Sequence, residues 1–174
     1  RRRIRAMVNG DWRRLGRHLL MTPWQFRRAL TPAILHALEA EIAAGERRHG
    51  GQVRLAVEGA LPVAALLRGQ SARERAVEVF ARLRVWDTEH NNGVLIYLLL
   101  ADRAVEIVAD RGIHARVKPG EWREICRAME EAFRHRRFKT GLLDGVQAVA
   151  QLLAQHFPPP AAPRNELPDR PVLL

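Results

Sequence analysis

Two loops rich in acids, amides and histidines hold the side chains of this sequence that could do chemistry. The first loop precedes an apolar run, Val94 to Ala101, and the second follows a shorter run, Val105 to Ala109. Carboxylate and amide oxygens are the ligands that Ca²⁺ and Mg²⁺ prefer, and a neighbouring imidazole could transfer a proton in phosphoryl chemistry. The candidate ion ligands are Asp87, Asn92 and Asp110, and the residues expected at the rim of the site are Glu89, His90, Arg111 and His114.

The two apolar runs explain why these loops should meet. A polar turn at Asp102-Arg103 separates the runs, and each run is short, which together predict a β-hairpin in the middle of a sheet. Antiparallel pairing places the start of the first strand beside the end of the second, so residues about 18 apart in sequence should lie together. Asp102 and Glu58 are expected at the opposite edge of the sheet.

The same cluster has a simpler explanation, which the spacing alone favours. Asn-Asn-Gly and Asp-Arg-Gly are good turn sequences, since Asn and Gly tolerate a positive φ and Asp bonds its own backbone. Arg111 could also pair with Asp87 or Glu89 without any ligand. The sequence has no Gly-rich phosphate loop, serine nucleophile elbow, or paired-histidine or paired-cysteine metal motif. No catalytic residue is therefore assigned, and Ca²⁺ or Mg²⁺ is the only candidate cofactor.

The remaining elements predict a single α/β domain over residues 31–157. Thr31-Pro32 is a good helix start, residues 52–58 alternate as a strand, and Ser71 begins a second helix with a capping box. A strand–helix–strand unit makes the first two strands parallel, with a right-handed crossover. Because residues 94–100 are apolar at consecutive positions, the mixed sheet should be buried between helices on both faces, as an α/β/α sandwich.

The basic charge belongs to an N-terminal arm, residues 1–30. The arm holds nine arginines and one acid, whereas the rest of the chain is nearly neutral. Arginines interleaved with tryptophan and leucine predict a basic amphipathic helix on an anionic membrane surface. The alternative is a solvated arm whose Trp24 and Phe26 pack against the domain. The residues assigned to the membrane-surface arm are Trp12, Arg13, Arg14, Arg17 and Trp24.

Composition excludes several classes of protein. A single cysteine, Cys126, rules out an internal disulfide and a Cys-based zinc site. There is no membrane-spanning run and no signal pattern, which predicts a cytoplasmic or peripheral membrane protein. Specific nucleic-acid binding is not expected, because the basic arm has no folded scaffold to place it in a groove. Residues 158–174 hold six of the ten prolines and predict a disordered tail. The sequence does not specify an oligomeric state.

With these residues in view, the chain resembles the TPM domain family. The resemblance rests on residues 92–97 (Asn-Gly-Val-Leu-Ile-Tyr), on the paired segment 105–114, and on Trp122 in the following helix, and it covers about residues 31–157. It implies a mixed β-sheet between helices. The family includes a thylakoid-lumen acid phosphatase, a photosystem II repair protein, a receptor-associated membrane protein and many bacterial proteins of unknown role.

The resemblance implies two functions. We expect a non-catalytic or weakly catalytic binding module that works with a membrane or a membrane-complex partner. The alternative is an acid phosphatase that acts on phosphomonoesters with the help of a divalent metal. The family's phosphatase chemistry relies on acids near the sheet edge, where Asp110 and Asn92 match the motif and Asp87 matches more loosely. The chain looks closest to the short bacterial members, which carry a basic stretch before the domain.

Overall fold

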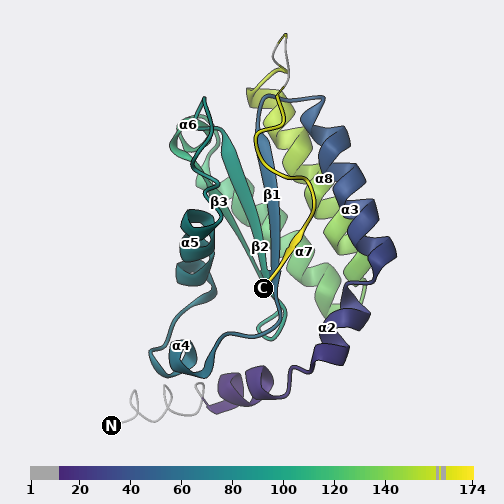
Figure 1. Cartoon of the computed structure of the whole chain (residues 1–174), viewed down its shortest axis with the longest axis vertical. Helices are drawn as coiled ribbons and strands as arrows, with labels where there is room; N and C mark the ends of the chain where they lie inside the picture. Colours follow the sequence, from purple (N-terminus) through teal and green to yellow (C-terminus); the bar gives the residue numbers. More distant parts are fainter. Residues whose placement is uncertain (1–11, 160, 162–163) are drawn as a thin grey trace.

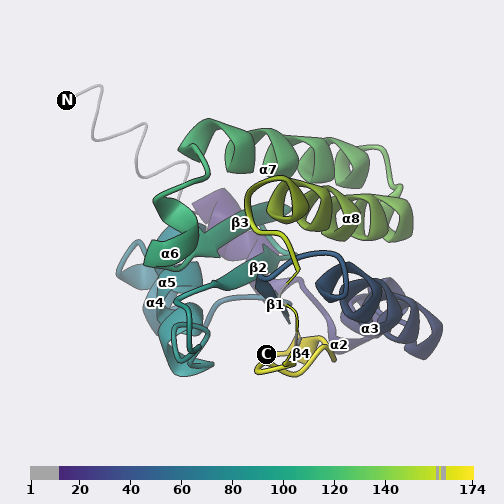
Figure 2. The ribbon, with the colours of Figure 1, turned by 90° about the horizontal axis from the view of Figure 1, so that it is seen from above.

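The computed structural model describes residues 12–159, 161 and 164–174. It contains a mixed four-stranded sheet in the order β3-β2-β1-β4, with helices on both faces (Figures 1 and 2). The strands are β1 (Gln52–Glu58), β2 (Gly93–Leu99), β3 (Ala104–Ala109) and β4 (Val172–Leu173). The helices are α2 (Pro23–Ala29), α3 (Pro32–Glu46), α4 (Val63–Leu67), α5 (Ala72–Arg82), α6 (Arg111–His114), α7 (Pro119–Arg134) and α8 (Phe138–His156), and residues 12–19 are also helical.

The predicted single α/β domain with a mixed sheet between helices is confirmed. β1 and β2 pair in parallel, with Gln52 opposite Gly93, and α5 forms the crossover between them. β2 and β3 form the predicted antiparallel hairpin. Every residue of β2 is buried because α3, α7 and α8 pack on one face of the sheet, while α5 packs on the other. The apolar side chains of β2 therefore alternate between two hydrophobic cores, one on each face of the sheet.

Helices α7 and α8 pack closely because α8 presents glycines to its neighbour. A Cβ built on Gly145 would lie only 2.3 Å from the sulfur of Met129, and one on Gly141 would lie 2.7 Å from the Cβ of Ala132. The absent side chains let Met129 and Phe133 of α7 reach the core below, where both are buried. This contact fixes the helical layer over the first face of the sheet.

The N-terminal arm, as far as the structure describes it, packs against the domain. Residues 1–11 lie outside the described residues. His18 is only 4% exposed, and Asp102, at the tip of the hairpin, accepts hydrogen bonds from Arg14 at 2.9 Å and from Arg17 at 3.0 Å. Phe26 lies beneath Gly59, whereas Trp24 stays 65% exposed. Residues 12–30 form two short helices, residues 12–19 and α2, which cover the edge of the sheet where β1 ends.

Disorder was predicted for the proline-rich tail, but residues 164–174 have a defined path. They run beside β1 and end in β4, which pairs in parallel with Ala56 and Val57 (Figure 2). Leu167 is buried in the core on the α5 side of the sheet. The prediction was wrong for these residues because composition does not register the few specific contacts that hold them.

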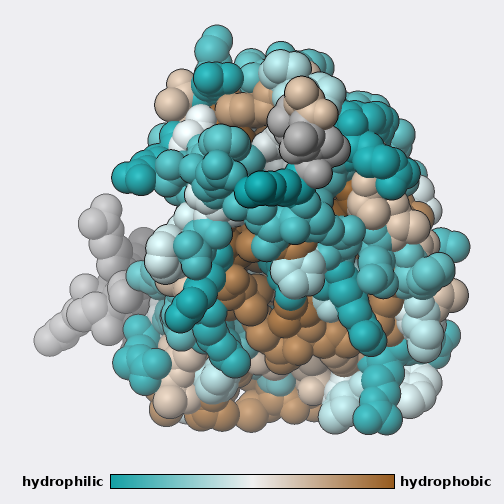
Figure 3. Space-filling view, turned by 45° about the horizontal axis from the view of Figure 1, so that its top comes forward, coloured by the Kyte–Doolittle hydropathy of each residue, from teal (hydrophilic) through white to brown (hydrophobic). Residues whose placement is uncertain are grey.

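Apolar side chains remain exposed along the lower rim of the molecule, where Figure 1 places α4 and residues 12–19, and they continue toward the centre of the face drawn in Figure 3. No helix among the described residues is both long and apolar enough to cross a membrane.

Candidate functional site

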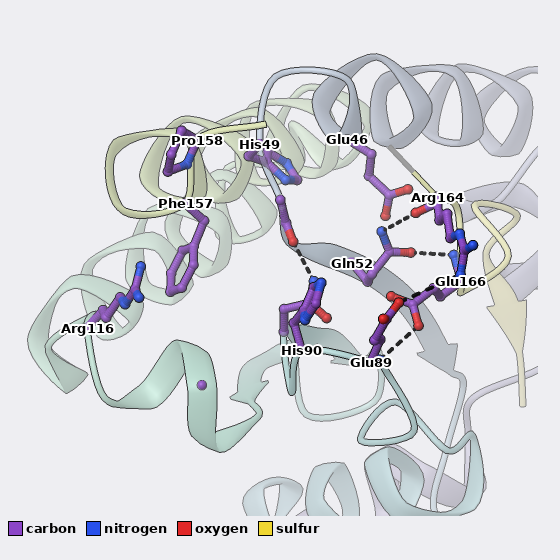
Figure 4. A pocket seen from close by; sticks show the side chains of 13 residues that line it. Glu46, His49, Gln52, Glu89, His90, Arg116, Phe157, Pro158, Arg164 and Glu166 are labelled. Atoms are coloured by element: carbon purple, nitrogen blue, oxygen red, sulfur yellow. Dashed lines mark hydrogen bonds and ion pairs between the residues drawn. The ribbon is translucent and has the colours of Figure 1, made fainter. Parts of the chain in front are cut away.

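A hollow of about 510 Å³ lies at the edge of the sheet where the parallel strands β1 and β2 begin (Figure 4). We call it the loop-edge cavity. Five parts of the chain surround it: the turn between α3 and β1, the loop before β2, α6 with the residues that follow it, the end of α8, and the segment that begins at Arg164. The residues whose side chains matter for its chemistry are Glu46, His49, Gln52, Glu89, His90, Asn92, Arg116, Phe157, Arg164 and Glu166.

Two polar side chains on the wall of the cavity are buried without all their partners. Asn92 is 6% exposed; its amide nitrogen donates to the carbonyl oxygen of Gly50, while Oδ1 has no partner. His49 is 1% exposed; its Nδ1 lies 3.2 Å from both the amide nitrogen and the carbonyl oxygen of Gly51, while Nε2 has no partner. Burial lowers the pKa of His49 to about 4, so the ring is neutral at pH 7. Leaving a buried polar atom unpaired costs about 1–3 kcal/mol.

The third buried group on the wall is the carboxyl of Glu46. One of its oxygens accepts the N–H of Val53, the second residue of β1, at 2.7 Å. The pKa of Glu46 is raised to about 7, mainly by burial, with a smaller raising effect from the nearby carboxyl of Asp169 and a lowering effect from the Val53 hydrogen bond. Near neutral pH this carboxyl is therefore divided between its charged and neutral forms.

Of the residues predicted from the sequence, Asn92, Glu89 and His90 line the loop-edge cavity. Glu89 lies at the rim, where its carboxylate is 3.8 Å from Arg164 and its backbone N–H donates to Glu166 at 2.9 Å (Figure 4).

The backbone of Asp110 lies near that of Asn92, but the Asp110 side chain does not line the loop-edge cavity. Its N–H donates to the carbonyl oxygen of Gly93 at 2.8 Å, so antiparallel alternation turns the side chains of Asp110 and Asn92 toward opposite faces of the sheet. Asp110 caps α6 through a 2.7 Å hydrogen bond from Arg111 N–H to Oδ1, and its other oxygen is buried without a partner.

The other predicted residues lie apart from the cavity. Asp87 is exposed in the turn after α5. Arg111 donates to the Asn91 side chain at 2.9 Å and makes no ion pair with Asp87 or Glu89 in the described part of the chain. His114 lines a separate hollow on the outer side of β3. Within residues 12–159, 161 and 164–174, no group of three or more His, Cys, Asp or Glu side chains is arranged to hold a metal ion.

Sequence reasoning missed the contribution of β1 and of the C-terminal segment to this edge. A signal for the first was present: because β1 runs parallel to β2, the residues before it, His49 among them, must reach the same edge. No comparable signal points to Arg164 and Glu166, since nothing in a proline-rich composition specifies where the segment returns.

The opposite edge of the sheet has its own polar cluster, centred on Asp102. His18 accepts the N–H of Leu61 through Nδ1 at 2.9 Å, and its Nε2 lies 3.2 Å from Asp102. Burial lowers the pKa of His18 despite the neighbouring carboxylate. Burial opposes ionisation of Asp102 as well, but hydrogen bonds from Arg14 and Arg17 hold its pKa below the ordinary value. The cluster thus contains a charged Asp102 carboxylate that is paired with Arg14 and Arg17 of the N-terminal arm.

Next to this cluster, large apolar side chains point into solvent. Their exposed fractions range from 63% for Leu19 to 74% for Leu20 and Leu67. The arm helix and α4 adjoin there, around a hollow of about 410 Å³ lined by both. We call this surface the arm face; its apolar members are Trp12, Leu19, Leu20, Trp24 and Leu67.

Comparisons with known proteins agree with this architecture. A profile of the TPM domain matches residues 25–152. The NMR structure of the BA42 protein from the psychrophilic bacterium Bizionia argentinensis is similar, with 29% identity and a TM-score of 0.73, covering 83% of this chain and 95% of that chain. The N-terminal domain of a protein from P. gingivalis shares the fold, with 22% identity and a TM-score of 0.58 over 74% of this chain and 80% of that chain. A search of curated proteins found no match. Because the profile spans most of the sequence, the chain belongs to the TPM domain family.

Proposed function

We propose that this TPM domain is a binding module, without strong catalytic activity of its own, that docks on an anionic membrane surface through the arm face. The observation that supports the proposal is the exposure of five large apolar side chains, two of them tryptophans, in residues 12–30 and in α4. Monomeric proteins rarely leave such a group uncovered unless it contacts a partner or a membrane.

The chemistry around the arm face favours an anionic lipid surface as the partner. Four exposed arginines lie close to the apolar residues in sequence, and the guanidinium of one of them, Arg28, lies 5.2 Å from the centre of the Trp24 ring. Tryptophan prefers the headgroup level of a bilayer, and each basic residue near an anionic surface contributes about 1 kcal/mol. The four arginines are Arg13, Arg27, Arg28 and Arg68.

The arm face has a fixed shape before any membrane is present. Arg14 and Arg17, which the sequence assigned to the lipid, are instead bonded to Asp102 and hold the arm helix on the hairpin tip. α2 is fixed by a capping box between Thr22 and Gln25. A preformed face loses less conformational entropy on docking than a free arm would.

Flotation with lipid vesicles tests the proposal. The chain should float with vesicles that contain phosphatidylglycerol and should stay in solution with phosphatidylcholine alone, and added salt should weaken the binding. Trp24→Ala and Leu20→Ser should each reduce the bound fraction several-fold. The matched control is Trp86→Ala, which removes a 50% exposed tryptophan from the loop-edge end of the molecule. Equal losses in the control and the arm-face variants would contradict the proposal.

A second candidate function is divalent-ion binding at the loop edge, with phosphatase activity as its catalytic form. It is supported by the buried, unpartnered Oδ1 of Asn92 on the wall of the loop-edge cavity, an amide oxygen of the kind that a hard cation accepts as a ligand. Ca²⁺ or Mg²⁺ at 100 times its dissociation constant should stabilise the fold by about 2.7 kcal/mol. An unchanged melting temperature of the wild type at millimolar concentrations of either ion would remove this candidate. Metal-dependent hydrolysis of an aryl phosphate would establish the enzyme.

A further inference from the structure

Residues 164–174 are held on the outer edge of β1 mainly through their backbone. The side-chain amide of Gln52 makes three hydrogen bonds, of 2.7–3.2 Å, to backbone groups of residues 164–167. The guanidinium of Arg54 donates to two carbonyl oxygens within residues 168–170. Figure 4 shows the Gln52 amide between β1 and the C-terminal segment. Contacts of this kind recognise an extended backbone and place little restriction on most side chains of the segment.

Two side chains of the segment act as anchors. Leu167 is 7% exposed and belongs to the core between the sheet and α5, and Pro171 is also buried. After the second anchor the chain adds β4 to the sheet, and Leu174 N–H donates to the carbonyl oxygen of Val57 at 2.9 Å. Backbone hydrogen bonds together with alternate side-chain pockets are the usual features of peptide recognition at a sheet edge.

The segment lies outside the part of the chain that the family profile matches. The profile ends at residue 152, before the segment begins. Residues 158–163 that precede the segment contain four prolines, and the strand pairing covers only two residues. Segments with so short a pairing can open locally without unfolding of the whole domain.

On the outer edge of β3, side chains already occupy backbone groups that an added strand would need. Glu130 accepts the N–H of Val105 at 3.1 Å, and Arg73 donates to the carbonyl oxygen of Ile107 at 2.6 Å. Edge strands are commonly protected in this way against pairing with other chains. β1 is therefore the edge of this sheet that accepts a strand.

We infer that the outer edge of β1 is a peptide-binding groove, and that residues 164–174 occupy it in competition with an extended partner segment of Leu-x-x-x-Pro spacing. The partner is a protein segment that carries a leucine for the Leu167 pocket and a proline for the second anchor. The groove lies beside the loop-edge cavity, so the inference does not depend on docking through the arm face.

A fluorescent peptide with the sequence of residues 164–174 tests the groove on the full chain. Leu167→Asp in the protein should expel its own segment while leaving Gln52 and Arg54 in place. This variant should bind the peptide roughly tenfold or more tightly than the wild type, because the competing occupant is gone. Arg170→Gln changes an exposed side chain of the same segment and is the matched control, expected to behave as the wild type. A peptide with aspartate in place of its leucine should not bind.

Two results would overturn the inference. One is a folded Leu167→Asp variant that does not bind the peptide, and the other is binding that survives the addition of Gln52→Ala. If Leu167→Asp does not fold, hydrogen exchange of the wild type is measured in its place. Excess peptide should speed the exchange of the Leu174 amide, because the peptide displaces the segment. An unchanged exchange rate would also overturn the inference. Dimers that form at high concentration and disappear with Gln52→Ala would support the groove and identify a second copy as one source of the segment.

Discussion

The buried ion pair beneath α5 permits a quantitative prediction about what fastens this helix to the sheet. Glu58, at the end of β1, is 4% exposed. Its two oxygens are 2.8 and 2.9 Å from Arg75 of α5, and the hydroxyl of Tyr97 donates to the same carboxylate at 2.7 Å. The side chain of Arg75 is itself only 11% exposed.

Arg75→Met should lower the free energy of unfolding by about 3–5 kcal/mol, because it leaves the Glu58 carboxylate buried without its cation. Tyr97→Phe removes one hydrogen bond to the same charge and should cost less, about 1.5–3 kcal/mol. The double variant Glu58→Leu/Arg75→Met replaces the pair by apolar groups and should recover much of the loss. Urea unfolding followed by circular dichroism measures all three. A loss below about 1 kcal/mol for Arg75→Met, with an unchanged m-value, would refute the reasoning.

Three further predictions concern other parts of the fold. Gly145→Ala should destabilise the domain by about 1–3 kcal/mol in urea unfolding, since its Cβ would meet Met129, whereas Gly120→Ala, where no atom lies within 4 Å, should not. The raised pKa of Glu46 gives stability that is lost as pH rises from about 4.5 to 7, and the lowered pKa of His49 gives stability that is lost as pH falls from 6.5 to about 4. Between pH 4.5 and 6.5 the two effects oppose one another. The free energy of unfolding of Glu46→Gln should therefore rise more steeply with pH than that of the wild type. Identical pH profiles for the two proteins would contradict this prediction. Asp102→Asn should loosen the arm helix and speed hydrogen exchange of the Leu61 amide, which His18 accepts; unchanged exchange would show that the clasp is not needed.

The elements that could be predicted from the sequence are those with a periodic apolar pattern. The hairpin follows from the two short runs around Asp102, and the parallel pairing of β1 with β2 follows from the intervening helix capped by Ser71. These features depend on local spacing and on general rules of chain connection, which a single sequence contains.

The composition of the candidate site could be predicted only in part, for a geometric reason. The sequence placed Asn92 and Asp110 at one edge, and their backbones do lie together, but the alternation of the strands separates their side chains. The path of residues 164–174 depends on Gln52 and Arg54, more than a hundred residues earlier, and no local pattern encodes such a pairing.

The arm face and the loop-edge cavity lie at opposite ends of the same strands, which determines what a docked molecule would present to solution. Each of β1 and β2 has seven residues, which span roughly 23 Å at the usual rise per residue. The potential of an anionic bilayer decays over a Debye length of about 8 Å at physiological ionic strength. A domain seated on its arm face would therefore hold the loop-edge cavity beyond the reach of lipid charge. The affinity of the cavity for a ligand should then be the same on neutral and acidic membranes, while the residence of the protein on the membrane varies.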